Sequence, residues 1–346
     1  MHGRASVGGQ SLQVSRPSPQ PDGAPASALG KLGTMGWASL CSPGRTTGQN
    51  RHHADIGREG PMRTDAGGNG IVWSPARRMD GAHGSVKCEE AILEEMAVSL
   101  ILNGKPYAVM MITPDHLEDF FMGFLYGEGV IRSVADIITW ESVCIPEGST
   151  LYLQVSAEAE ARAARKRRLV IGGSACGLCG TPNFEHLVPF APIPIDHDVC
   201  AEPALVHDLL HEMRAHQRLN RHTGTAHAAV LAATNGMTLV REDIGRHNAV
   251  DKTIGAALRQ GWPPSGNILL GVSSRLTFEI ALKALSFQVP IVAAISGVSS
   301  LAIRIAQTHN LTLVGYARDQ RLTIYAHGER FRGNAATIHD LLCENG

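Results

Sequence analysis

The sequence predicts an α/β fold in which a smaller N-terminal α+β subdomain precedes a C-terminal α/β domain. Two observations carry this prediction. The C-terminal half repeats continuous apolar runs of strand length, each followed by a helical pattern, which is typical of parallel strands that are covered on both faces. Residues 95–155 instead hold two pairs of β-rich runs joined by turn residues, which is typical of antiparallel pairing.

Composition narrows the class of protein. The chain has 346 residues, is 44% hydrophobic and carries a formal net charge of −1, so it is long enough for two domains and has no basic surplus that would indicate nucleic acid. No apolar run reaches transmembrane length, and the N-terminus lacks the apolar core of a signal peptide. The 7 scattered cysteines do not form a secreted disulfide framework. We therefore expect a cytoplasmic protein without a membrane role.

The N-terminal half divides into two parts. Residues 1–84 are rich in Gly, Pro, Ser and Arg without periodicity, and are predicted to be a disordered extension. Order is expected to begin near Ser85 with the α+β subdomain, residues 85–200. Its predicted elements are a hairpin about Asn103-Gly104, a helix starting at Thr113-Pro114-Asp115, a second strand pair about Pro146-Glu147-Gly148 and a short helix over 157–168.

The α/β domain is predicted over residues 201–346. Its expected elements are an amphipathic helix over 202–219, two strands about Asn235-Gly236, a helix over 249–258, and strands over 267–272, 290–295 and 311–315, the first two of which lead into helices. The polar segment Arg241–Asn248 lies between two apolar elements. Burial of so many charges is costly without partners. The segment therefore forms either a paired network at a site edge or a solvated helix N-terminus.

Three polar segments follow the predicted parallel strands: Ser273–Arg275, Ser296–Ser300 and the loop Tyr316–Arg321. They should meet at the edge where α/β sheets bind ligands, because all three lie at the carboxyl ends of strands. Small loops that open into helix N-termini, together with arginines at 275, 318 and 321, favour an anion site that suits phosphates. No Walker A or Gly-x-Gly-x-x-Gly element is present, so ordinary ATP or NAD binding is not indicated.

A glycine-rich segment, residues 172–180, carries Cys176 and Cys179 and is predicted to lie in a mobile loop over 165–183. Thr181-Pro182 would cap and begin a helix, which favours the thiolate of the preceding cysteine. Three interpretations remain open: a zinc site completed by His197 and Cys200, a thioredoxin-type dithiol, and a thiol that carries a group between partners.

Five motifs together resemble the FdhD family of sulfurtransferases, which formate dehydrogenases require. The motifs read Cys176-Gly-Leu-Cys179-Gly, Thr223-Gly-x-x-His227-Ala-Ala, Glu242-Asp-Ile-Gly-Arg246-His247, Ser273-Ser-Arg275 and Tyr325-x-His327, and the resemblance runs from about Glu94 to Phe331. The resemblance implies a cytidine-deaminase-like fold for the C-terminal domain. It also implies a sulfur carrier that takes sulfur from a cysteine desulfurase as a cysteine persulfide. The sulfur then passes to molybdenum or tungsten bis-molybdopterin guanine dinucleotide, before that cofactor is inserted into formate dehydrogenase.

The resemblance assigns roles to individual residues. Cys176 is expected to carry the persulfide, with Cys179 as its partner or alternate acceptor. The residues expected to bind the cofactor are Tyr316, Ala317, Arg318, Asp319, Gln320, Arg321, Ser273, Ser274, Arg275, His227, Arg246 and His247. The cofactor is a bound substrate, so no permanent cofactor and no metal-ligating residue is assigned. The expected partners are the desulfurase, the catalytic subunit of formate dehydrogenase and a second copy of this chain.

The sequence argues against one other activity and leaves a second one open. A zinc deaminase needs His-x-Glu followed by Pro-Cys-x-x-Cys, whereas His227 is followed by two alanines and the cysteine pair precedes it, so deamination is not expected. The remaining alternative is a zinc-structured nucleotide-binding or regulatory module whose cysteines never carry sulfur.

Overall fold

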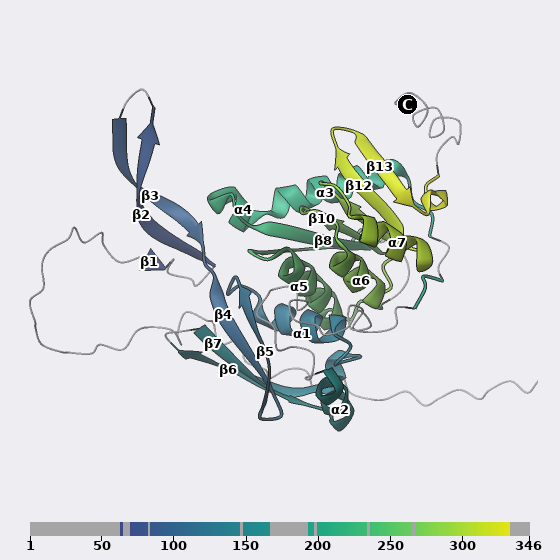
Figure 1. Cartoon of the computed structure of the whole chain (residues 1–346), viewed down its shortest axis with the longest axis horizontal. Helices are drawn as coiled ribbons and strands as arrows, with labels where there is room; N and C mark the ends of the chain where they lie inside the picture. Colours follow the sequence, from purple (N-terminus) through teal and green to yellow (C-terminus); the bar gives the residue numbers. More distant parts are fainter. Residues whose placement is uncertain are drawn as a thin grey trace, which may run out of the picture.

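The computed structural model describes residues 63–64, 70–81, 84–145, 148–166, 193–196, 199–233, 236–264 and 268–332. The described part contains three β-sheets (Figure 1). Cys176, Cys179 and His197 lie outside the described residues, and so does most of the predicted cysteine loop. Among the helices that the structure describes, none is both long enough and apolar enough to cross a membrane.

A two-stranded ribbon projects from the body of the molecule (Figure 1). It consists of β2 (Ile71–Asp80) and β3 (Gly84–Leu93), which pair antiparallel along their whole length, and β1 (Arg63–Thr64) pairs with the start of β2. The prediction of a disordered extension over 1–84 is therefore wrong for residues 71–80.

The base of this ribbon explains why the sequence pattern failed there. Ile71 and Leu93 form a small buried cluster with Leu219 and Ala226, which lie far along the chain. Ile71, at the start of β2, becomes buried through these distant partners, so local composition does not predict the strand.

The N-terminal sheet has four strands in the order β5-β4-β7-β6. Its strands are β4 (Met96–Leu102), β5 (Lys105–Ile112), β6 (Ile137–Ile145) and β7 (Gly148–Val155). Helices α1 (Leu117–Gly127) and α2 (Ala157–Lys166) share one core with the inward side chains of this sheet, and the short helix η2 (Val134–Asp136) precedes β6. Both predicted strand pairs and both predicted helices are confirmed.

The C-terminal sheet has six strands in the order β13-β12-β11-β10-β8-β9. Its strands are β8 (His227–Ala233), β9 (Thr238–Asp243), β10 (Ile268–Val272), β11 (Ile291–Ala294), β12 (Thr312–Arg318) and β13 (Arg321–Ala326). The predicted parallel pairing is confirmed for β10, β11 and β12. The other three strands pair antiparallel, so the sheet is mixed.

Helices cover both faces of this sheet, as the apolar strands predict. One face packs against α5 (Arg246–Arg259), α6 (Phe278–Ser286) and α7 (Ser300–Thr308), and the other packs against α3 (Pro203–His216). The short helix η5 (Gly328–Arg330) follows β13. The likeness of this unit to cytidine deaminases stays a prediction.

The helix predicted over 202–219 is instead two helices, because α3 ends and α4 (Arg218–Thr223) begins around Gln217. The carboxylate of Glu242 accepts hydrogen bonds from the backbone N–H groups of Leu219 and Asn220, at 2.6 and 2.8 Å. An acceptor from a distant strand thus satisfies the free donors of a new helix start, which no local pattern reveals.

Candidate ligand-binding site

Strand direction brings the predicted site residues to one edge of the six-stranded sheet. The segments after β10, β11 and β12 meet there because these strands are parallel. β8 is antiparallel to β10, so its first residue, His227, lies at the same edge. His227 pairs with Asp243, the last residue of β9, and α5 begins with Arg246 shortly after it.

The segment after β10 is fixed against the start of β8. Ser273 Oγ accepts a hydrogen bond from the N–H of Ala228 at 2.9 Å, and the N–H of Ser273 donates to the carbonyl of Ala228 at 3.0 Å. Ser274 Oγ donates to the carbonyl of Arg275 at 2.9 Å. The side chain of Arg275 is left exposed beside His227.

The electrostatics of His227 show that cations gather at this edge. Burial lowers the pKa of His227, and the neighbouring charges of Arg246 and Arg275 lower it further, against the opposing effect of Asp243. The imidazole is therefore neutral at pH 7, while the nearby guanidinium groups keep the edge positive. This field favours an anionic ligand.

Four arginines at this edge have no carboxylate partner. Arg246, Arg275, Arg318 and Arg321 form no ion pair with any residue in the described part of the chain. A guanidinium group without a carboxylate keeps its fork of donors for a ligand phosphate. These arginines are the groups best placed to hold a phosphorylated ligand.

The prediction of a loop over Tyr316–Arg321 is wrong, because the structure has a β-hairpin there. β12 runs to Arg318, β13 starts at Arg321, and these two residues pair directly. Asp319 and Gln320 have φ angles of 52° and 63°, and positive φ at both central residues is the mark of a tight hairpin turn that glycine usually occupies. Both arginine side chains are exposed at the hairpin tip.

Tyr316 closes over the segment after β11. Its N–H donates to the carbonyl of Ser296 at 3.0 Å, and a Cβ added to Gly297 would lie only 2.6 Å from its hydroxyl oxygen. Its φ angle of 50° and its 47% exposure present a half-exposed ring at the site. A side chain at position 297 would therefore displace the ring of Tyr316.

The width of the site follows from the strand order. Three strand spacings separate β8 from β12, and a spacing of about 4.8 Å gives roughly 15 Å between His227 and the base of the β12–β13 hairpin. This span is longer than a single phosphate needs and fits an extended ligand with several charged groups.

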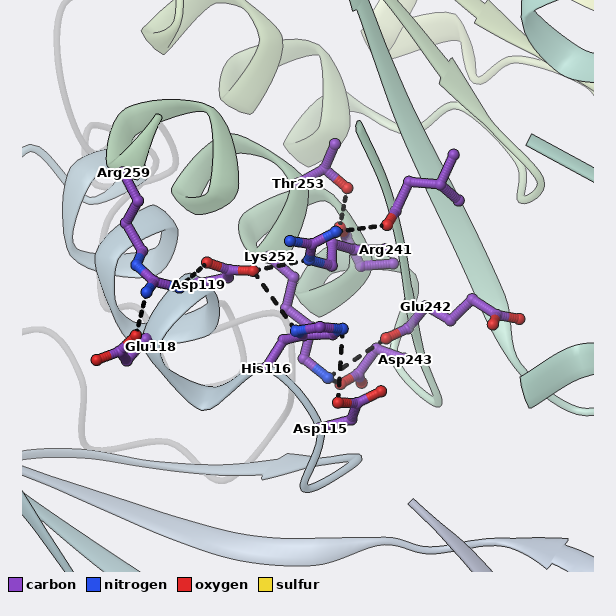
Figure 2. A network of polar contacts seen from close by, with 12 residues as sticks. Asp115, His116, Glu118, Asp119, Arg241, Glu242, Asp243, Lys252, Thr253 and Arg259 are labelled. Carbon is purple, nitrogen blue, oxygen red and sulfur yellow. Dashed lines mark hydrogen bonds and ion pairs between the residues drawn. The ribbon is translucent and has the colours of Figure 1, made fainter. Parts of the chain in front are cut away.

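A buried ion pair supports the edge from below (Figure 2). Lys252 Nζ lies 2.7 Å from Asp243 Oδ2, and both side chains have no exposed surface. Asp243 also accepts hydrogen bonds from the N–H groups of Thr113 and Gly245 and from the side chain of Asn248. The paired network predicted over Arg241–Asn248 is confirmed here, and it fixes the turn that carries Arg246.

A second buried cluster ties α1 to the same framework (Figure 2). Asp119 accepts hydrogen bonds from Arg241 Nε at 2.7 Å and from Arg259 Nη1 at 2.8 Å, and Arg259 also pairs with Glu118. Burial lowers the pKa of His116, which lies beside Asp119. The N-terminal helix is thus held to β9 and α5 by paired charges.

Three residues of this region escaped the sequence reasoning: Asp119, Lys252 and Glu279. Lys252 lies in the buried helix α5, and Asp119 lies in the aromatic segment of α1. Such positions indicate that the charged side chain is buried, but the sequence does not show which residue pairs with it. Burial tends to raise the pKa of Glu279, but the nearby side chains of His247 and Thr277 lower it to about 2. Glu279 is therefore an anion at the start of α6.

The zinc interpretation of the cysteines rests mostly on residues outside the described ranges. Of its four predicted ligands only Cys200 is described, and its exposed Sγ accepts a hydrogen bond from Arg332 Nε at 2.8 Å. Within the described ranges, no group of three or more His, Cys, Asp or Glu side chains could hold a metal ion.

A family model and the most similar curated proteins indicate the same family for this chain. A model of the FdhD/NarQ family matches residues 93–332. The sulfur carrier protein FdhD of Xanthomonas axonopodis pv. citri is 38% identical over 262 residues, which cover 75% of this chain and 92% of the relative. The protein of the same name from Bordetella parapertussis is 39% identical over 245 residues, which cover 69% of this chain and 86% of the relative.

A solved structure supports the fold. A crystal structure from Desulfotalea psychrophila, described as that of a formate dehydrogenase accessory protein, superposes with a TM-score of 0.59 at 24% identity. The match covers 76% of this chain and 99% of the other. At 24% identity this structural similarity supports the fold but not the function.

Proposed function

Because this chain belongs to the FdhD/NarQ family, we propose that it is a sulfur carrier protein that serves formate dehydrogenase. It accepts sulfur from a cysteine desulfurase as a persulfide on Cys176. It then transfers that sulfur to molybdenum or tungsten bis-molybdopterin guanine dinucleotide, which is its bound substrate. The observation that carries the proposal is the edge with four arginines that form no ion pair with any described residue, because such a ligand contains pyrophosphate groups.

The charges of the site fit the shape of this substrate. Arg246 and Arg275 lie at the β8–β10 end, and Arg318 and Arg321 lie on the hairpin at the β12 end, roughly 15 Å away by strand spacing. Phosphates at either end can each take a pair of guanidinium groups. The half-exposed ring of Tyr316 between them offers a stacking surface for a base.

The sulfur step is a thiol exchange. The thiolate of Cys176 attacks the terminal sulfur of the desulfurase persulfide, a new S–S bond forms on Cys176, and the desulfurase thiolate leaves. Cys176 lies ten residues beyond Lys166, the end of α2, so an extended chain reaches at most about 33–36 Å from that helix. Cys179 serves as partner or alternate acceptor. A cytoplasmic location and a homodimer belong to the same proposal.

Replacing the two hairpin arginines by alanine, in Arg318→Ala/Arg321→Ala, is expected to weaken ligand binding by roughly tenfold for each arginine, about 1.4 kcal/mol each. Guanosine diphosphate, a fragment of the dinucleotide, is the probe, and titration calorimetry measures its affinity. The matched control is Arg304→Ala, an exposed arginine on α7, which should bind as the wild type does.

The same titration on Cys176→Ala separates binding from sulfur transfer. This variant should bind the probe with wild-type affinity, because the thiol takes no part in holding phosphates. Wild-type affinity in the double arginine variant would rule out the hairpin as the phosphate site. Lost affinity in Cys176→Ala would rule out the proposed division of roles.

A further inference from the structure

Two helix N-termini meet at the ligand edge and bring two polar side chains together. His247 lies in the first turn of α5 and Glu279 in the first turn of α6. His247 Nε2 is 3.8 Å from Glu279 Oε2, and the two side chains are only 8% and 16% exposed. Both atoms are buried and have no hydrogen-bond partner within the described part of the chain.

Two buried polar atoms without hydrogen bonds lower the stability of the folded state. A buried donor or acceptor without a partner costs about 1–3 kcal/mol. A shift of roughly 1 Å brings the two atoms to hydrogen-bond distance and removes both costs at once. Thr277 Oγ1 is also buried without a partner among the described residues, so the carboxylate of Glu279 can accept from both His247 and Thr277 through its two oxygens.

Glu279 is the anionic member of this pair. The nearby side chains of His247 and Thr277 and the backbone N–H at the start of α6 lower its pKa to about 2 despite its burial, so Glu279 is ionised throughout the range from pH 5 to 8. The titratable groups that act on His247 are Glu279 from α6, Asp251 from its own helix and His227 from β8. An ionised carboxylate can only accept a hydrogen bond.

We infer that Glu279 is a positioning residue that turns the Nε2–H of His247 inward and leaves the Nδ1 lone pair as an acceptor at the ligand edge. A neutral imidazole has one donor and one acceptor nitrogen, so a proton on Nε2 fixes Nδ1 as the acceptor. Nδ1 has no partner among the described residues and is not one of the buried unpaired atoms.

The inference deepens the proposed function and rests on it only for the identity of the ligand. The arginines at this edge recognise phosphate, whereas a fixed acceptor recognises an N–H or O–H donor of the ligand. His247 would therefore distinguish a nucleotide, which carries such donors on its base and ribose, from pyrophosphate alone.

The tautomer of His247 tests the inference without any ligand. The full chain is labelled with ¹⁵N-histidine, and long-range ¹H–¹⁵N correlation is recorded at pH 8, with His247→Gln used to assign the signal. The neutral ring of the wild type should carry its proton on Nε2. Glu279→Met, which keeps the length of the side chain but removes the acceptor, should give a mixture of tautomers, and Glu279→Gln, which keeps an acceptor, should restore the wild-type pattern.

The chain offers a matched control in the exposed pair His327–Glu329, whose atoms lie 3.0 Å apart. Glu329→Gln makes the same chemical change away from the site and should leave the His247 signals unchanged. A wild-type proton on Nδ1 overturns the inference even if no variant folds. An unchanged tautomer in folded Glu279→Met overturns it as well.

Binding adds a second readout. Glu279→Met should weaken guanosine diphosphate roughly tenfold, about 1.4 kcal/mol, and leave inorganic pyrophosphate unaffected. Equal weakening of both probes overturns the specificity role. If neither probe binds the wild type, the proposed function fails, and the tautomer measurement still decides the role of Glu279.

Discussion

Gly123→Ala is expected to destabilise the protein by about 3 kcal/mol or more. Helices α1 and α5 cross in contact at two glycines. A Cβ at Gly123 would lie 1.8 Å from the carbonyl oxygen of Asp251, and one at Gly255 would lie 1.8 Å from that of Asp119. The obstacle is main chain in both cases, so no side-chain rotation can relieve it and the helices must separate.

Urea denaturation monitored by circular dichroism measures this effect. The matched control is Gly81→Ala, because a Cβ there meets nothing within 4 Å and its stability should stay within about 0.5 kcal/mol of the wild type. A wild-type midpoint for Gly123→Ala would contradict the close crossing of the two helices.

Lys252→Met is expected to cost about 3–5 kcal/mol, because it leaves the buried carboxylate of Asp243 without its cation. Lys252 Nζ also donates to the carbonyls of Thr113 and Glu242, so the ammonium joins α5 to β9 and to the residue that follows β5. Methionine fills a similar volume, which makes the loss of charge the dominant effect. Equilibrium unfolding gives the free energy of unfolding directly.

The surface pair Lys105–Glu160 provides the comparison, since its atoms are also 2.7 Å apart but its side chains are 58% and 30% exposed. Lys105→Met should cost no more than about 1 kcal/mol, because water screens an exposed pair. Adding Asp243→Asn to Lys252→Met should recover part of the lost stability by removing the unpaired charge. A double variant less stable than Lys252→Met alone would argue against this reason.

The Lys252–Asp243 pair and the crossing of α1 with α5 both position the short turn before Arg246. Asp243 accepts from the N–H of Gly245, which is the residue before Arg246 at the start of α5. The α1 crossing holds the same helix from its other side. The position of Arg246 at the edge thus depends on a buried framework of paired charges and close helix packing.

Periodic features of the sequence predicted the elements that position the site. Continuous apolar runs around residues 268–272, 291–294 and 312–315 predicted three parallel strands, and the polar segments after them predicted the edge where His227, Arg246 and Arg275 now lie. This succeeded because burial of a central strand leaves its mark on every residue of that strand.

The features that failed depend on partners far away in the chain. β2 becomes buried against Leu219 and Ala226, and the break before α4 uses a carboxylate of β9. The partners Asp119–Arg241 and Asp243–Lys252 also come from separate elements. A single sequence shows that a buried charge needs a partner, but it does not show which one.

The proposed function requires Cys176 to carry sulfur as a persulfide, and intact mass spectrometry detects that sulfur directly. The purified protein is incubated with a cysteine desulfurase and cysteine, with and without reductant, beside Cys176→Ala and Cys88→Ala as a matched cysteine control. The wild type and Cys88→Ala should gain one sulfur, about 32 Da, that reductant removes, and Cys176→Ala should not. The same gain in Cys176→Ala, or no gain in the wild type, would contradict it.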